Sequence, residues 1–287
     1  MKKTQHRSPH SQHGEEERSQ EHRQHHAGHE RQSPAAAPAS AAVKQQSLTN
    51  INLQFDPATP TAGEPVKLTL TVTEQRTGEP LTIFEKIHDR LMHLIIVNTS
   101  DLSIFAHLHP TFVEENGSRF EITHTFHEAD EYKAWVDVKP QGASQVLAAF
   151  RFKVAGEPVH KPKATGRDEE QFSKVVDNGC YRIDLVLPDH VATGHNVNIT
   201  FRIADSEGNP IRDLEPLMAA GGHCVIITSD AKEFLHVHPA EEVAENWRGG
   251  SDVTFSATFP KSGAYRIWGQ FQHKGRVITA DYDLVVK

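Results

Sequence analysis

An internal duplication constrains the fold of this sequence more than any other feature. Residues 78–93, GEPLTIFEKIHDRLMH, align without a gap to residues 208–223, GNPIRDLEPLMAAGGH, and both segments end on a histidine. Farther along the chain, YKAW at 132–135 matches YRIW at 265–268. Two copies of one pattern within 287 residues predict two similar domains of roughly 105 residues each, and a domain of that size can bury its own core.

Alternation of apolar and polar residues recurs through both halves of the chain. VKLTLTVT at 66–73 is a clear case, since a period of two residues is typical of strands with one buried face. Further candidate strands lie at 93–97, 119–126, 132–138, 146–154, 181–187, 196–204, 223–228, 252–259, 265–271 and 277–286. No helical pattern of similar length competes with them, so the sequence predicts an all-β fold of two tandem antiparallel β-sandwiches.

The composition along the sequence divides the chain into four parts. Residues 1–46 are rich in polar residues and pass into a Pro/Ala stretch, which predicts a disordered His-rich tail and a linker. The two sandwiches are expected at 47–155 and 178–287, with a charged, Pro- and Gly-bearing interdomain linker at 156–177. The tail is either a low-affinity metal sponge or a solvated polar segment, and its histidines are His6, His10, His13, His22, His25, His26 and His29.

The overall composition favours a soluble globular protein, because 37% of the residues are hydrophobic and 24% are charged. A net charge of −8 without a basic stripe argues against nucleic acid as a partner. The N-terminus, MKKTQHRSPHSQHGEEERSQ, has lysines but no apolar segment behind them. No apolar run approaches the roughly 18 residues of a membrane span, so this start indicates a cytoplasmic protein without a span.

The same histidine-rich hexapeptide occurs once in each half, as FAHLHP at 105–110 and as FLHVHP at 234–239. Side chains alternate along a strand, so the two histidines of each motif point to one face. A proline cannot donate a hydrogen bond to a sheet ladder, so each motif should end its strand, at a sandwich end where loops leave access. In each half a lone histidine, His93 or His223, opens the strand before the motif.

We expect each lone histidine to pair across a hairpin with the first histidine of the following motif. A loop of three residues in the first half places His93 opposite His107, and a loop of two residues in the second half places His223 opposite His236. Opposed residues of an antiparallel pair share a face, with Cβ atoms roughly 4.5–5.5 Å apart. Each hairpin is therefore expected to gather three imidazoles.

Three neutral imidazoles on rigid strands suit Zn²⁺, Cu²⁺ or Ni²⁺, and they leave a position open for water, a further ligand or a substrate. The sequence thus predicts one copper or zinc site per sandwich, formed by His93, His107 and His109 in the first and by His223, His236 and His238 in the second. The candidate accessory ligands are His88, Met218, His124 and His127. Met218, which aligns with His88, would favour Cu(I) if it is not simply a core residue.

Histidines that only pack are the alternative to a metal site. A duplicated structural motif would also repeat, and buried histidines can hydrogen-bond the backbone. Three histidines kept in register in both halves, while most neighbouring positions differ, favour metal binding. Cys224 follows His223 directly and is expected to face the other way as a buried thiol; with Cys180 it forms no CxxC pair, so a bridge and two free thiols both stay open.

Three segments resemble a known family: MHLIIVNTSDLSIFAHLHP at 92–110, DLEPLMAAGGHCVIITSDAKEFLHVHP at 213–239 and YRIWGQFQHKGRVITADYDLVV at 265–286. They are similar to the small bacterial β-sandwich domains of the YtkA-like kind and to the HxHP-containing envelope proteins that accompany heavy-metal, especially copper, resistance systems. The resemblance covers 49–155 and 178–287. It implies an immunoglobulin-like or cupredoxin-like fold, metal handling without an established catalytic activity, and a metal efflux or resistance system as partner. It also implies a secreted or cell-envelope location, in contrast to the cytoplasmic location that the N-terminus indicates.

Three functions compete at this point. The main expectation is a non-enzymatic protein that sequesters or transfers copper or zinc. The second is a two-domain cupin-like metalloenzyme or a hydrolase with a three-histidine zinc site, since Glu114 and Glu242 follow the two HxH motifs. However, the glycine that a cupin motif carries six residues before its first histidine is Asp101 or Asp230 here. The third is a structural tandem immunoglobulin-like protein whose histidines pack.

Overall fold

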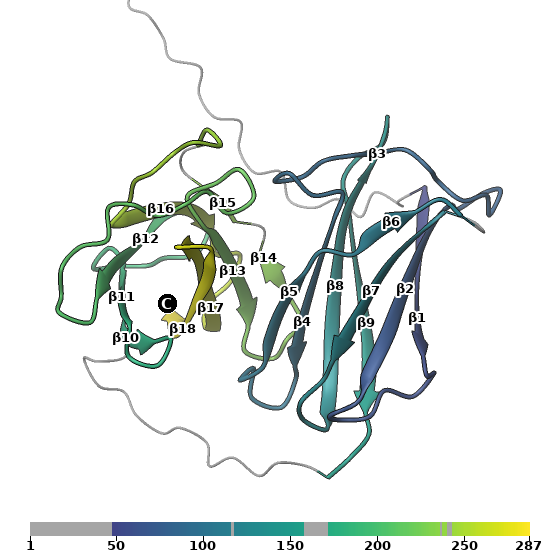
Figure 1. The fold of residues 1–287 in the computed structure, drawn as a ribbon, viewed down its shortest axis with the longest axis horizontal. Coiled ribbons are helices and arrows are strands. Elements are labelled where there is room, and N and C mark those ends of the chain that lie inside the picture. The colour runs from purple at the N-terminus through teal and green to yellow at the C-terminus, as the bar shows by residue number, and fades with distance from the viewer. Residues whose placement is uncertain (1–47, 116–117, 158–171, 236, 240–242) are drawn as a thin grey trace, which may run out of the picture. The chain divides into compact units, whose positions relative to one another are not determined.

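A computed structural model of the chain describes residues 48–115, 118–157, 172–235, 237–239 and 243–287 (Figure 1). The named elements in these ranges are all strands, and no helix there is long and apolar enough to cross a membrane. Residues Gln46–Lys287 form one compact unit. The predicted tail, residues 1–46 with its histidines, lies outside the described residues, as does most of the predicted linker.

The first sandwich consists of two antiparallel sheets. Its strands are β1 (Thr49–Asp56), β2 (Pro65–Glu74), β3 (Phe84–Glu85), β4 (Met92–Asn98), β5 (Phe105–Leu108), β6 (Thr111–Val113), β7 (Arg119–Thr125), β8 (Asp130–Pro140) and β9 (Val146–Val154). One sheet has the order β1-β2-β7-β6, and the other has the order β3-β8-β4-β5 with β9 also paired to β8.

The second sandwich is built in the same way. Its strands are β10 (Ser173–Val176), β11 (Tyr181–Val186), β12 (Asn196–Asp205), β13 (His223–Thr228), β14 (Phe234–Leu235), β15 (His238–Pro239), β16 (Asp252–Thr258), β17 (Gly263–His273) and β18 (Arg276–Val286). Its two sheets have the orders β10-β11-β12-β16-β15 and β14-β13-β17-β18.

The two sandwiches repeat one strand order. β1, β2, β7 and β6 correspond to β11, β12, β16 and β15, while β9, β8, β4 and β5 correspond to β18, β17, β13 and β14. The predicted strands from 66–73 to 277–286 are all present, so the predicted all-β fold of two tandem antiparallel, immunoglobulin-like sandwiches is confirmed. β10, which lies in the segment expected to be linker, pairs with β11 as an additional edge strand.

The core of each sandwich lies between its two sheets. Along β2 the side chains alternate as predicted, and the inward ones, from Val66 to Val72, are buried in the first core. The second core is formed in the same way by alternate residues of β12, from Val197 to Ile203. Both cores are apolar and continuous, so each sandwich has the one contiguous core expected of a domain.

β4 and β13 differ from the other strands because every one of their residues is buried. In β4, Leu94 belongs to the core of the first sandwich, whereas Ile95 and Val97 belong to a separate apolar cluster. The same cluster contains Val225 and Ile227 of β13. The outer faces of the two central sheets are therefore packed against each other, and this second face is where His93 and His223 lie by alternation.

Aromatic pairs join the two sandwiches in a reciprocal way. Phe105 of the first stacks on Trp268 of the second, with ring centroids 4.8 Å apart and an interplanar angle of 14°. Trp135 of the first lies against Phe234 of the second, with centroids 5.9 Å apart. Because Phe105 corresponds to Phe234 and Trp135 to Trp268, each contact is the counterpart of the other. The interface thus has the self-complementary pattern of a two-fold symmetric pair.

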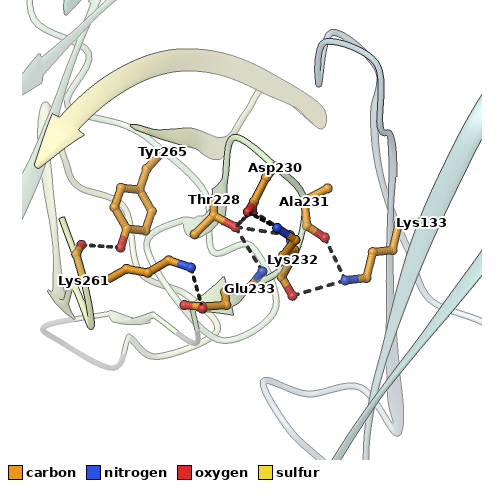
Figure 2. A network of polar contacts seen from close by, with 8 residues as sticks. All are labelled: Lys133, Thr228, Asp230, Ala231, Lys232, Glu233, Lys261 and Tyr265. Atoms are coloured by element: carbon orange, nitrogen blue, oxygen red, sulfur yellow. Dashed lines mark hydrogen bonds and ion pairs between the residues drawn. The ribbon is translucent and has the colours of Figure 1, made fainter. Parts of the chain in front are cut away.

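Lys133, on the same face of β8 as Trp135, reaches across this interface (Figure 2). Its ammonium donates to the carbonyl oxygens of Ala231 at 2.7 Å and Lys232 at 3.2 Å, and lies 4.6 Å from the Trp135 ring centroid. The receiving loop is held in shape because Thr228 Oγ1 donates to the carboxylate of Asp230 at 2.7 Å. A buried ammonium requires such acceptors, so Lys133 anchors the contact between the sandwiches.

Candidate metal centre

The hairpin register of the first sandwich differs from the predicted one. His107 lies opposite Ile95 rather than His93, because the loop extends to the bond from Asn98 N to Ile104 O. In the second sandwich the register is shifted in the same direction, with Ile226 opposite Leu235. The prediction that His93 opposes His107 was therefore wrong, and the described pairs of both hairpins are shifted by two residues from the predicted register; His236, the predicted partner of His223, lies outside the described residues. Since side chains repeat every second residue, His93 keeps the same face as His107.

Three imidazoles converge on the outer face of the first sandwich. His93 Nδ1 lies 3.0 Å from His107 Nε2, which in turn lies 3.3 Å from His109 Nε2. One nitrogen from each of the three rings lies within 4.8 Å of the others. The HxH spacing puts His107 and His109 side by side, with ring centroids 4.6 Å apart, as the sequence predicted. The predicted ligand set of the first half is thus brought together.

The outer nitrogens of two of these rings already have acceptors. His93 Nε2 lies 2.8 Å from the carbonyl oxygen of Ile87, and His107 Nδ1 lies 2.8 Å from Oε1 of Gln270. Gln270 Nε2 donates to Thr279 Oγ1 at 3.2 Å, which leaves the amide oxygen for His107. A neutral imidazole has one N–H and one lone pair, and a carbonyl oxygen can only accept, so the N–H of His93 is on Nε2. The lone pair of His93 Nδ1 then faces His107 Nε2.

A tight turn supplies the carbonyl that holds His93. Ile87 and Arg90 exchange backbone hydrogen bonds of 2.7 and 3.0 Å, and the two residues between them have positive φ, 46° for His88 and 61° for Asp89. Positive φ at both central positions defines a type I′ turn, which non-glycine residues adopt at a cost. The turn leaves the Ile87 carbonyl directed at the His93 ring.

The second sandwich repeats this turn and its contact. Met218 and Ala219 have φ of 52° and 60° between Leu217 and Ala220, and His223 Nε2 lies 3.0 Å from the Leu217 carbonyl oxygen. The gapless alignment of the two segments therefore corresponds to a repeated three-dimensional structure. In both halves the lone histidine is tied to the turn six residues before it.

Burial lowers the pKa of three of these histidines, His107, His109 and His223. Desolvation lowers the pKa of His107 to about 4, opposed by its hydrogen bond to Gln270, and lowers the pKa of His109 to about 3 with help from its neighbours His107 and His93. Burial also lowers the pKa of His223 well below its usual range. Metal ions bind neutral imidazole, so these rings carry no proton that an ion must displace at neutral pH.

The second half contributes His223 to the same place. Its ring centroid lies 5.6 Å from that of His107 and 6.2 Å from that of His93, across the interface. His88 completes the group at 5.4 Å from His223. Together with His93 and His107, these rings line a cavity of about 40 Å³ between the sandwiches. The cluster lies where β4 begins and β5 ends, as expected for a sandwich end, and the second sandwich packs against one side of it.

The other two predicted ligands of the second half are His236 and His238. His236 and the side chain of His238 lie outside the described residues. The backbone of His238 is in β15, which pairs with β16 in the sheet that does not contain His223. The proline after it, Pro239, is the last residue of this short edge strand, as expected. Pro110 of the first half lies between β5 and β6, as expected.

Of the accessory candidates, only His88 joins the histidines. Met218 lines a neighbouring cleft of about 570 Å³ instead. His124 lies on β7 in the opposite sheet with its ring 4.7 Å from that of Phe126, and His127 follows that strand on the surface. Glu114, the cupin-type candidate, is exposed beyond β6, while Glu242 lies outside the described residues.

The two cysteines are free. Cys180 is exposed, whereas Cys224 is buried in the core of the second sandwich, on the side of β13 opposite His223, as predicted. Burial raises the pKa of the Cys224 thiol. A protonated, buried thiol is a packing residue and a poor metal ligand.

Gln270 and the Ile87 carbonyl are the parts of the site that the sequence analysis missed. Gln270 follows Trp268 by two residues on β17 and belongs to the other sandwich, so no local spacing connects it with His107. Its counterpart in the first half is Asp137, whose carboxylate accepts from Gln145 Nε2 at 2.7 and 2.8 Å. Only knowledge of how the sandwiches dock identifies Gln270.

Comparisons with known proteins give a family but no activity. A family model described as a domain of unknown function, DUF8832, matches residues 45–156 and again 174–287. No curated protein matches the sequence. The expected YtkA-like or HxHP relationship is not tested by this match and stays a prediction.

Several solved structures share weak likenesses with the chain. The Yersinia pseudotuberculosis adhesin InvE is 10% identical with a TM-score of 0.25, covering 83% of this chain and 58% of that one. The Escherichia coli adhesin FdeC is 15% identical with a TM-score of 0.26, covering 84% and 64%. A marsupial T cell receptor is 11% identical with a TM-score of 0.22, covering 83% and 95%. The chain spans less than two thirds of the two adhesin chains, and likenesses this weak say nothing about what it binds.

Proposed function

Since the chain belongs to the DUF8832 family and carries two copies of its domain, we propose that it is a non-enzymatic protein that binds a copper or zinc ion at His93, His107 and His109. Sequestration or transfer of the ion is the role that such a site serves without catalysis. A metal efflux or resistance system as partner, and a location in the cell envelope, belong to the same proposal.

The observation that carries the proposal is the convergence of three imidazoles, because one nitrogen from each of His93, His107 and His109 lies within 4.8 Å of the others. His93 Nδ1 lies 3.0 Å from His107 Nε2, which in turn lies 3.3 Å from His109 Nε2. The second ring nitrogens of His93 and His107 are hydrogen-bonded, as those of metal-binding histidines usually are.

The donor set narrows the choice of ion. Three imidazole nitrogens suit Zn²⁺ and Cu²⁺ better than Mg²⁺ or Ca²⁺, which prefer oxygen. In a tetrahedral zinc site with Zn–N of about 2.0–2.1 Å, neighbouring nitrogens are roughly 3.3 Å apart. The separations of 3.0 and 3.3 Å along the triad are close to that value.

A calorimetric titration of the full chain with Zn²⁺ and Cu²⁺ tests the proposal. The double variant His107→Ala/His109→Ala is expected to lose one equivalent, and the control His190→Ala/His195→Ala, which removes two exposed histidines, is expected to lose none at this site. The titration is run at pH 5.5, where an unburied histidine with a pKa near 6.5 is largely protonated, whereas His107 and His109 stay neutral. Equal binding by the two double variants would overturn the proposal.

A structural role is the second candidate, and a specific observation favours it. His93 and His223 each donate to a turn carbonyl, Ile87 O or Leu217 O, and this contact stabilises the fold without any ion. In a tandem immunoglobulin-like protein of this kind the histidines would only pack. An ion that binds the folded state alone must raise its melting temperature, so an unchanged melting temperature in excess Zn²⁺ and in excess Cu²⁺ would favour this candidate.

A further inference from the structure

The contact between His107 and Gln270 crosses from one sandwich to the other. His107 lies on β5 of the first sandwich, and Gln270 lies on β17 of the second. Phe105, two residues before His107, stacks on Trp268, two residues before Gln270. The two strands thus meet through two consecutive side-chain pairs, one apolar and one polar, and the stacked pair sets the position of the hydrogen-bonded one.

Gln270 also contacts the neighbouring strand of its own sheet. It lies directly opposite Thr279 in the β17–β18 ladder, and its amide nitrogen donates to the Thr279 hydroxyl at 3.2 Å. The amide oxygen lies 2.8 Å from His107 Nδ1. An oxygen at this position fixes the proton on Nδ1 and leaves the lone pair on Nε2, the nitrogen that faces His93 and His109.

We propose that the second sandwich sets the metal affinity of the triad through Gln270, which acts as a positioning residue and not as a ligand. This inference rests on the proposed function, because it concerns the same site. The acceptor selects the ring tautomer that can bind an ion and makes Nε2 more basic, and loss of such an acceptor weakens metal binding about 10- to 100-fold. Affinity therefore depends on how the two sandwiches are docked, and ion binding strengthens the docking by the same factor.

The test compares Gln270→Leu with Gln272→Leu in the full chain by competition of Zn²⁺ against a chelator at pH 7.5. Gln272 lies on the same face of β17, but its amide nitrogen donates to the carboxylate of Glu215 at 3.0 Å. Gln270→Leu is expected to bind Zn²⁺ about 10- to 100-fold more weakly, and Gln272→Leu is expected to bind within about 2-fold of wild type.

Two further variants separate positioning from packing. Gln270→Glu keeps an oxygen acceptor for His107 and is expected to restore wild-type affinity or exceed it. Thr279→Val removes the exposed hydroxyl that bonds the amide, and is expected to weaken binding about 3- to 10-fold because the amide is then free to turn. The electron paramagnetic resonance spectrum of bound Cu²⁺ should change in Gln270→Leu and not in Gln272→Leu.

The outcomes for the two proposals differ. If the wild-type chain takes up neither Zn²⁺ nor Cu²⁺ at the triad, the proposed function fails. If the wild type binds an ion and Gln270→Leu binds it equally well, the control by the second sandwich is wrong while the metal site stands. If Gln270→Glu is as weak as Gln270→Leu, Gln270 acts by packing, and its role as an acceptor is wrong.

Discussion

The two sandwiches share a scaffold and differ in what their outer faces present to each other. Both use a tight turn whose carbonyl holds a lone histidine, His93 on Ile87 and His223 on Leu217, at 2.8 and 3.0 Å. The turn itself carries His88 in the first half and Met218 in the second, and only His88 faces the other histidines. The two copies therefore share the tight turn and its contact with the lone histidine, but they differ in the side chain that the turn carries.

A second difference lies one strand away. The position two residues after each interface tryptophan is Asp137 in the first half and Gln270 in the second. Asp137 is engaged by Gln145 of its own sandwich, whereas Gln270 reaches His107 of the other. The residue at this position thus bonds within its own sandwich in the first half and bonds across the interface in the second.

The largest effect is expected from the aromatic pairs. Trp268→Ala removes a side chain that is 2% exposed and stacked on Phe105, and should lower the free energy of unfolding by about 3–5 kcal/mol. Trp135→Ala, its counterpart at 3% exposure, should cost a similar amount because the interface is reciprocal. Urea unfolding of the metal-free proteins measures both. A loss confined to one tryptophan would break the two-fold relationship.

The next effect is a dependence of stability on pH in the metal-free chain. The pKa of His107 is about 4 when folded and about 6.5 when unfolded, so the unfolded state binds more protons between these values. The stability that neutral His107 contributes is fully present above pH 6.5 and is lost as the pH falls to 4, with a limit on the order of 3 kcal/mol. His107→Gln should flatten this part of the profile, whereas His195→Gln, on the surface, should leave it unchanged.

Metal affinity should separate the two lone histidines. His93→Ala removes a triad member and should weaken Zn²⁺ binding about 100-fold, which corresponds to about 2.7 kcal/mol. His223→Ala should change the affinity by less than about 5-fold, because no nitrogen of His223 belongs to the triad. Both variants lose one turn contact and should lose about 1 kcal/mol of stability each. Zn²⁺ affinity is measured by chelator competition. Equal losses in the two variants would show that His223 contributes as much to the site as His93 and would contradict the prediction.

The smallest effect concerns Lys133 and its counterpart Arg266. Lys133→Met removes donors to two carbonyl oxygens of the opposite sandwich and should cost about 1–2 kcal/mol. Arg266 instead pairs with Asp281 and Asp283 on the neighbouring strand of its own sheet, and Arg266→Met should cost less than about 1 kcal/mol. Thermal unfolding of the two variants checks the order, and a larger loss for Arg266→Met would contradict it.

The fold and part of the site could be predicted from local patterns. Period-two alternation located the strands, the duplication located the domains, and the HxH spacing put His107 and His109 on one face. The register was off by two residues because hairpin loop length is set by loop hydrogen bonds such as Asn98 N to Ile104 O, which the pattern does not fix. His93 stayed with its partners because an even shift preserves the face.

The contribution of the second sandwich could not be predicted from spacing, because docking joins residues that are far apart in the chain. One signal was nevertheless present in the sequence. HLIIV at 93–97 and HCVIIT at 223–228 are almost continuously apolar, unlike VKLTLTVT at 66–73. A run without alternation indicates burial on both faces of a strand, and thus a further layer over the sheet. That reading places the histidines between two sheets before any coordinates are known.

The strands β4 and β13, which are buried on both faces, also determine how an isolated sandwich would behave in solution. Separating the two sandwiches by cleavage of the linker would expose the apolar interface of each, which includes Val97 in the first and Ile227 in the second. A surface that already fits a near-copy of itself is suited to recruiting a second identical piece. The isolated first sandwich is therefore expected to dimerise through this surface, and the dimer interface would then contain two copies of the triad His93, His107 and His109.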